Sequence, residues 1–259
     1  MKKDEDGDVK IKTSDGTKIK TEGDANKEGT PALTYSSKYD FVPGEKVVAF
    51  EDFSKEAIGE FPTRWNTNGS AEVVTLNKKK GKWLKISPEG YFFPEFMTNI
   101  PENSTLEFGL GVNTNYDSGS QPLKIEIVDL KNREGFSNGN NWNSKHNIEL
   151  QFHPIRGDNY TGEVWLQTGG TENNITNSGH AKQWDNKENS FAHVSLWRQG
   201  QRLRVYVNGD KLFDLPKLCQ PNSAYNALII HTDGFQNGKD DYMVLGNMRL
   251  AVGAPDTRK

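Results

Sequence analysis

The sequence is poor in apolar residues, in cysteine and in positive charge. Only 33% of its 259 residues are hydrophobic, and its mean hydropathy is −0.80. The longest apolar runs have about four residues, such as 227–230. A membrane-spanning helix needs about 20, so the sequence predicts no such segment. The net charge of −3 offers no basic surface for nucleic acid. Cys219 is the single cysteine, which excludes an internal disulfide.

The short motifs of common catalytic and metal sites are also missing. The sequence has no Glu-x-Asp-x-Glu strand of the laminarinase type, no His-x-x-x-His or Cys-x-x-Cys spacing and no phosphate-binding loop. Local spacing therefore predicts no transition-metal site and no hydrolase whose acids share one strand. Carboxylates from separate strands can still meet in space, so a hydrolase stays open as an alternative. We expect Cys219 to be buried and inert.

The first 38 residues differ in composition from the rest of the chain. No aromatic residue precedes Tyr35, and acidic and basic residues balance. Such a segment cannot bury enough apolar surface to offset its ordering entropy, so we expect 1–38 to be a flexible charged arm. A Lys-Ile-Lys-Thr repeat at 10–13 and 18–21 flanks Asp15-Gly16. Asp-Gly between matching runs is a hairpin signal, so the arm is expected to hold at most a marginal hairpin.

From residue 39 to about 253 the apolar residues follow a period of two. They alternate with polar residues or glycine over 106–112, 123–127, 148–152, 164–166, 192–196 and 203–207. This alternation is typical of strands with one buried face, and no long stretch shows a helical stripe. The pattern predicts an all-β fold, an antiparallel sandwich or barrel. Asn208-Gly209 predicts a two-residue turn within a meander of 191–198, 201–207 and 210–215.

One stretch resembles a known fold class. The run Phe191-Ala-His-Val-Ser-Leu-Trp-Arg leads, after a glycine turn, to Leu203-Arg-Val-Tyr-Val-Asn-Gly-Asp. This is similar to concanavalin A-like and laminin G-like jelly rolls. The run from Asn247 to Ala251 resembles their closing strand, which pairs beside the first strand, here Val47 to Phe53. The resemblance implies an antiparallel jelly-roll β-sandwich.

A second resemblance concerns the start of this domain. The runs 39–47, Phe50-Glu-Asp-Phe, 58–62 and Trp65-Asn-Thr-Asn-Gly-Ser resemble the sandwich module of OmpA family envelope proteins of Bacteroidetes. In that family a signal peptide precedes the module, and a peptidoglycan-binding domain follows it. The resemblance implies a protein of the periplasm or outer membrane, with residues 254–259 as a linker to a further domain. It implies nothing about what the sandwich binds.

The clearest candidate binding surface is the polar side of two predicted strands. Parity places Glu149, Gln151 and His153 on the face opposite the apolar residues of their strand, and Trp165 and Gln167 on that of the next. If the strands are neighbours, Trp165 lies among Glu, Gln and His side chains. An indole among amide and carboxyl groups suits a sugar ring, and small-molecule sites have this composition. The alternative is an ordinary solvated sheet face.

Two loops and one set of acids complete the candidates. Trp142 and Trp184 each lie among amides in a predicted loop, where they either bind ligand or anchor the loop on the core. Glu51, Asp52 and Asp241 are candidate ligands for a structural Ca²⁺, because this fold class often holds one near the chain ends. Their alternatives are ion pairs and solvated turns. No other cofactor is predicted.

These observations favour a non-catalytic binding module of the cell envelope. Its expected partner is a glycan or an envelope protein, and the family's peptidoglycan-binding domain would tether it. The alternatives are a carbohydrate-active hydrolase with acids from different strands, and a structural spacer.

Overall fold

A computed structural model gives the structure of the protein. It describes residues 40–86, 89–113, 115–117, 119–137, 144–156, 161–170, 174–181, 184, 191–233 and 240–255, together with strand segments at 2–3, 9–12, 18–21 and 34–37. The chain divides into two compact units, Met1–Phe41 and Val42–Lys259. Among the described residues no helix is long and apolar enough to cross a membrane.

The first unit contains four short strands. They are β1 (Lys2–Lys3), β2 (Val9–Lys12), β3 (Lys18–Thr21) and β4 (Thr34–Ser37), in that order across one sheet. β2 and β3 pair antiparallel with Ile11 opposite Ile19, which confirms the hairpin predicted from the repeat. β1 and β4 extend the hairpin on both sides, where the sequence predicted no further strands.

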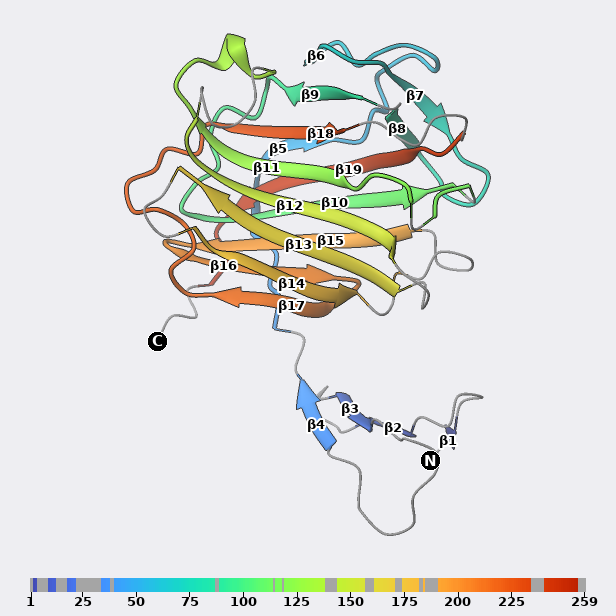
Figure 1. Cartoon of the computed structure of the whole chain (residues 1–259), viewed down its shortest axis with the longest axis vertical. Helices are drawn as coiled ribbons and strands as arrows, with labels where there is room; N and C mark the ends of the chain where they lie inside the picture. Colours follow the sequence, from blue (N-terminus) through green and yellow to red (C-terminus); the bar gives the residue numbers. More distant parts are fainter. Residues whose placement is uncertain are drawn as a thin grey trace. The chain divides into compact units, whose positions relative to one another are not determined.

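The second unit is a sandwich of two antiparallel sheets, and this confirms the predicted fold class (Figure 1). One sheet has the order β14 (Thr176–Ala181), β13 (Thr161–Gly169), β12 (Ser144–Arg156), β11 (Leu123–Leu130), β18 (Ala227–Thr232), β9 (Gly90–Pro94) and β6 (Trp65–Thr67). The other has the order β17 (Asp210–Leu215), β16 (Arg202–Val207), β15 (Phe191–Gln199), β10 (Asn103–Val112), β19 (Met243–Val252), β8 (Lys82–Ile86) and β7 (Ala71–Thr75), and β5 (Lys46–Glu51) also pairs with β19.

The core lies between the sheets and follows the period of two read from the sequence. Ile125 of β11 and Leu150 of β12 are fully buried on the inner side of the seven-stranded sheet. Phe108 of β10 meets Phe152 of β12 edge to face, with ring centroids 5.9 Å apart. Because every second residue of each strand points inward, this core decides which side chains form the outer faces.

The predicted local connections are also confirmed. β15, β16 and β17 are consecutive neighbours, and Asn208 and Gly209 join two of them with positive φ values of 49° and 85°. Such a turn needs positive φ at both central residues. β19 pairs with β5 near the start of the domain, with Leu250 opposite Ala49, as the jelly-roll resemblance implied.

Apolar side chains cover one part of the outer face of the seven-stranded sheet. Val128, Ile229 and Phe93, from three adjacent strands, form a small cluster there, separate from the main core. Phe136 follows the 3₁₀ turn at Arg133–Gly135 and stacks on Phe93 with ring centroids 5.1 Å apart. This loop closes one end of the face, and polar residues occupy the part beside it.

The outer face of the eight-stranded sheet contains one crowded contact that generates a prediction. Gly246 lies opposite Gly109, and a Cβ on either would lie within 3 Å of the Trp83 ring. Overpacking of this kind costs about 1–3 kcal/mol, so Gly246→Ala is expected to lower the free energy of unfolding by that amount. Urea unfolding measures it.

A double-mutant cycle with Trp83→Leu provides the control. The smaller side chain leaves room for the added methyl group, so Gly246→Ala is expected to cost clearly less in the Trp83→Leu background. An equal cost in both backgrounds would show that the Trp83 contact does not require the glycine.

Candidate functional site

The polar part of the outer face is built by the register of five adjacent strands. Residues directly opposite each other in an antiparallel pair lie on the same face. Glu126 of β11 is opposite Glu149 of β12, which is opposite Gln167 of β13. A neighbouring row crosses from β9 to β13 and contains Tyr91, His231, Lys124, Gln151 and Trp165. The strands that carry Gln151 and Trp165 are therefore neighbours, which is the condition on which the predicted binding surface depends.

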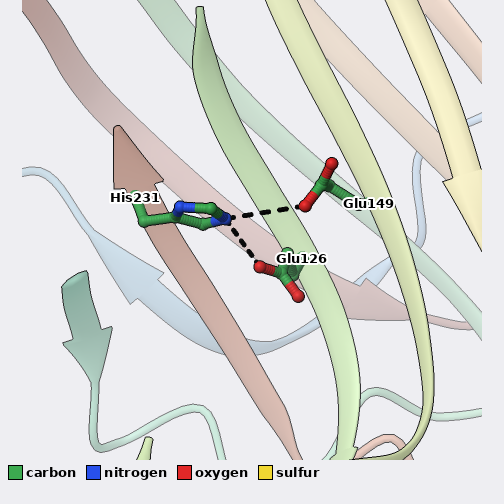
Figure 2. A group of neighbouring side chains, drawn as sticks. All are labelled: Glu126, Glu149 and His231. Atoms are coloured by element: carbon green, nitrogen blue, oxygen red, sulfur yellow. Dashed lines mark ion pairs between the residues drawn. The ribbon is translucent and has the colours of Figure 1, made fainter. Parts of the chain in front are cut away.

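Two carboxylates and one imidazole meet at the centre of this face (Figure 2). Nε2 of His231 lies 2.6 Å from Oε1 of Glu126 and 3.6 Å from Oε2 of Glu149. The exposed fractions of Glu126, His231 and Glu149 are 0%, 3% and 5%. The three side chains thus form a buried, charged cluster on a sheet face that would otherwise be solvated.

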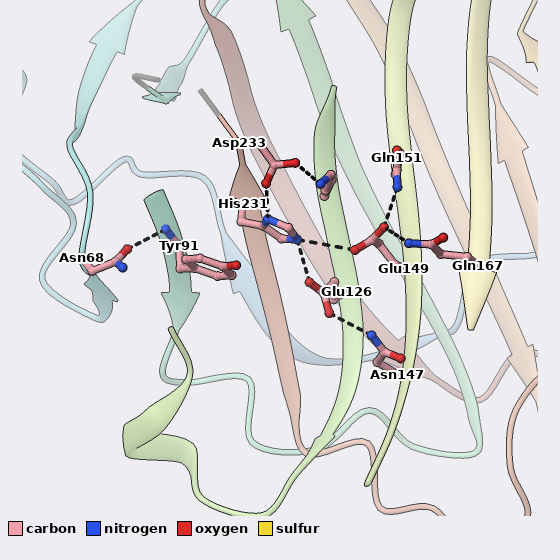
Figure 3. Close-up of polar contacts among 10 residues, drawn as sticks. Asn68, Tyr91, Glu126, Asn147, Glu149, Gln151, Gln167, His231 and Asp233 are labelled. Carbon is pink, nitrogen blue, oxygen red and sulfur yellow. Dashed lines mark hydrogen bonds and ion pairs between the residues drawn. The ribbon is translucent and has the colours of Figure 1, made fainter. Parts of the chain in front are cut away.

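The imidazole of His231 is held from its other sides as well. The Tyr91 ring stacks on it with centroids 4.7 Å apart and an angle of 10° between the planes. Nδ1 of His231 lies 3.8 Å from Oδ1 of Asp233 (Figure 3). The other carboxylate oxygen of Asp233 pairs with Lys124. Stacking and flanking charges therefore fix the ring plane, so that Nε2 faces the two glutamates.

Glu149 connects the buried cluster to the amides beside Trp165. Its Oε1 accepts hydrogen bonds from Nε2 of Gln151 and Nε2 of Gln167, both at 2.6 Å (Figure 3). Oε2 of Glu126 accepts a hydrogen bond from Nδ2 of Asn147 at 3.3 Å. The Glu149 carboxylate thus orients the amides of Gln151 and Gln167, and His231 in turn holds this carboxylate.

The buried groups shift each other's pKa values. Burial lowers the pKa of His231, but contact with the Glu126 and Glu149 carboxylates outweighs this and raises it to about 9. Burial raises the pKa of Glu149, but contacts with His231 and Gln151 and the charge of Lys124 outweigh this and lower it. At neutral pH the pair is therefore an imidazolium next to an ionised carboxylate.

A surface pocket of about 330 Å³ lies beside the cluster. Trp165 contributes an indole that is 36% exposed, and Gln151 and Lys124 extend the pocket toward the buried carboxylates. His153, the loop 119–122 and Asp233 complete its lining. The pocket thus combines an aromatic face with an amide, a cation and a carboxylate.

The structure separates the predicted site residues into groups. Glu149, Gln151, Trp165 and Gln167 come together as expected, and the mostly buried His153 lines the same pocket. Trp184 is wrong as a ligand residue, because it is fully buried and packs against Phe152. Its ring packs into the core, which was the alternative interpretation. Trp142 lies outside the described residues.

The predicted calcium trio is not brought together. Glu51 accepts hydrogen bonds from Arg64 and from the backbone of Phe53, and Asp52 accepts one from the backbone of Ser54. Asp241 accepts one from Ser120. Glu51 lies opposite Met248 on β19, and Met248 comes seven positions after Asp241, which is roughly 20 Å along an extended chain. The prediction of a joint site is therefore wrong.

Sequence reasoning missed the grouping of Glu126 and His231 with Glu149. Their ligand atoms lie within 4.8 Å of one another, and they form the one such group of three found among the described residues. They belong to β11, β12 and β18, so no local spacing marks them. The alternation of residues indicates that these side chains face outward. It does not indicate that β18 lies next to β11.

Comparisons with known proteins relate the chain to others by fold. No protein-family model matches it, and no curated protein matches its sequence. Its structure is similar to the Emp47p carbohydrate recognition domain, with a TM-score of 0.59 and 12% identity over 83% of this chain and 100% of that one. A GH16 protein of Bacteroides ovatus, solved with a mixed-linkage glucan product, matches with a TM-score of 0.56 and 10% identity over 79% and 100%.

LamAcat from Zobellia galactanivorans is also similar, with a TM-score of 0.55 and 15% identity over 80% of this chain and 98% of that one. At these identities the likeness shows the fold alone. It confirms the jelly-roll sandwich of concanavalin A-like type that the run 191–210 implied.

The buried imidazolium generates a prediction about pH. The pKa of His231 is about 9 in the folded chain against 6.5 in an unfolded one. Its contribution to stability is therefore complete below about pH 6.5 and is lost as the pH rises toward 9. The free energy of unfolding, relative to His231→Gln, is expected to fall by roughly 2–3 kcal/mol over this range.

Urea unfolding of both proteins between pH 6 and 9.5, with a chelator of divalent ions present, measures this difference. The other histidines occur in both proteins, so their titration cancels in the comparison. A stability difference that stays constant over the range would contradict the buried imidazolium.

Proposed function

We propose that the sandwich is a glycan-binding domain and that its ligand lies on the outer face of the seven-stranded sheet. The observation that carries the proposal is the partly exposed indole of Trp165 in a pocket with Gln151 and Lys124. One face of a sugar ring is apolar and stacks on an indole, while its hydroxyls need donors and acceptors. The pocket offers both kinds of contact side by side.

The amides of Gln151 and Gln167 are prepared for this role. Each donates one amide hydrogen to Glu149, which leaves its second hydrogen and its carbonyl oxygen for other partners. Since Glu149 is itself held by His231, the amides do not have to be ordered when a ligand binds. Preorganisation of this kind reduces the entropic cost of binding.

Similar structures support this choice of ligand. One is a carbohydrate recognition domain, and another was solved with a glucan product. Their identities to this chain are low, so the ligand class is proposed from the pocket and supported by these proteins.

Hydrolysis is the second candidate, and one observation favours it. Glu126 and Glu149 lie opposite each other on adjacent strands, and one carboxylate oxygen of each lies within 4.8 Å of the other. Retaining glycosidases hold their two carboxyl groups similarly close, roughly 5–5.5 Å apart. Both residues are buried, however, and the pKa of Glu149 is lowered. A catalytic acid needs a raised pKa and access to the substrate, so the cluster suits binding better than proton transfer.

A location in the cell envelope is part of the proposal. It rests on the resemblance of residues 39–70 to the sandwich module of OmpA family proteins, in which a peptidoglycan-binding domain provides the tether. A glycan-binding sandwich held in this way would capture saccharides, or glycosylated partners, at the cell surface. Pull-down from envelope extracts with the chain as bait is the direct test for a protein partner.

Removal of the indole tests the proposed binding surface. Trp165→Ala is expected to abolish binding of any glycan that the unmodified chain retains, because a sugar ring can no longer stack on the indole. Affinity electrophoresis through gels that contain soluble β-glucan, xylan, mannan, galactan or mucin measures retention, and a glycan array extends the panel.

The matched control is Phe50→Ala. Phe50 is 47% exposed, but it belongs to β5 and the other sheet, so its removal is expected to leave retention unchanged. If none of the glycans retains the chain, the proposed function is contradicted. Equal retention of Trp165→Ala and the unmodified chain would place the binding surface elsewhere.

The hydrolase candidate has its own test. Incubation of the same oligosaccharides with the chain is expected to give no products, because the buried acids do not reach a substrate. Products that appear with the unmodified chain and disappear with Glu149→Gln would establish the second candidate in place of the first.

A further inference from the structure

We propose that Glu126, Glu149 and His231 bind a first-row divalent transition-metal ion, of which Zn²⁺ is the type. The site lies under the proposed glycan pocket but does not depend on it. The lack of local ligand spacing in the sequence predicted no transition-metal site, and a bound ion here would make that prediction wrong.

The ligand atoms face a common point. In a tetrahedral zinc site, bond lengths of about 2.1 Å separate the ligand atoms by roughly 3.4 Å. Nε2 of His231 is 2.6 Å from one carboxylate oxygen and 3.6 Å from the other, so these distances bracket that value. The first oxygen needs to withdraw by less than about 1 Å to admit the ion.

Two of these atoms have no hydrogen-bond partner within the described part of the chain, although both are buried. Oε1 of Glu126 and Nε2 of His231 are fully buried, and neither has a hydrogen-bond partner among the described residues. Although they lie 2.6 Å apart, their approach does not have the direction of a hydrogen bond. Figure 2 shows both carboxylate oxygens ahead of the Nε2 corner of the ring, where an ion would contact all three atoms.

The surrounding groups resemble those that orient metal ligands in proteins. Outer hydrogen bonds usually occupy the atoms that a ligand residue does not give to the metal. Asn147 bonds the other oxygen of Glu126, and Gln151 and Gln167 bond the other oxygen of Glu149. The second ring nitrogen of His231 faces the Asp233 carboxylate at 3.8 Å. Each carboxylate is therefore held by the oxygen that faces away from the central point, and stacking on Tyr91 orients the imidazole.

Charge favours a divalent ion. When both carboxylates are ionised they carry a charge of −2, which one imidazolium only half compensates, and burial of uncompensated charge is costly. A divalent ion with a neutral imidazole balances this charge. The donor set also narrows the choice: imidazole nitrogen suits zinc and its neighbours, whereas Ca²⁺ and Mg²⁺ prefer oxygen ligands alone.

The surface pocket lies next to the cluster. Gln151 both lines this pocket and bonds Glu149, so one side chain connects the two. A bound ion would join β11, β12 and β18 and fix the Glu149 carboxylate that orients the amides.

The test measures metal binding without any glycan, so its outcome is independent of the proposed function. The tag-free chain is dialysed against Zn²⁺, and the bound metal is measured by mass spectrometry and by calorimetry. One equivalent of zinc per chain is expected. His231→Gln and Glu149→Gln are each expected to weaken binding at least roughly tenfold.

The matched control is His193→Gln. His193 pairs with Glu107 at 3.3 Å on the outer face of the other sheet and is well exposed, so it offers the same residue types without a third ligand. Its loss is expected to leave zinc binding unchanged. No bound zinc, or an equal loss of zinc in the His193 and His231 variants, would overturn the proposal.

A second measurement needs no variant and holds if His231→Gln fails to fold. Co²⁺ added to the unmodified chain is expected to broaden the NMR signals of residues around 126, 149 and 231 first. Broadening centred on any other part of the chain would overturn the proposal.

Discussion

The contact of His231 with Glu126 and Glu149 is the interaction on which the rest of the outer face depends. Two carboxylates opposite each other on neighbouring strands would repel, and a positive group between them is what permits their burial. The contact also decides where Glu149 points. The orientation of Gln151 and Gln167, and through them the surroundings of Trp165, follows from it.

The sandwich separates an apolar core between the sheets from the outer face that carries Glu126, Glu149 and His231. The inner faces of both sheets are filled by aliphatic and aromatic side chains, so the main core does not include the polar part of the outer face. Loop 131–137 covers one end of that face with Phe136, while the polar end keeps a pocket. The proposed binding surface thus lies outside the main core.

The resemblance of the run 191–210 implied a sandwich, where the period of two left a barrel open. Sequence alone also predicted the Asn208–Gly209 turn and the outward parity of Glu149 and Trp165, because these follow from periods and turns of a few residues. It could not predict that β18 would lie beside β11, and so it did not place His231 against Glu126. Nor could it predict that Trp184 would be buried, since a loop carries no period that separates inside from outside. Pairings distant in sequence set the chemistry of this site.

The central claim is that the ligand surface lies over β11, β12 and β13 on the outer side of the seven-stranded sheet. An NMR map of backbone amides and tryptophan indoles, recorded during titration with an oligosaccharide that the chain retains, tests it most directly. We expect the largest shifts from the Trp165 indole and from residues 124–126, 149–151 and 165–167. Shifts centred on β5 or on the eight-stranded sheet would contradict it.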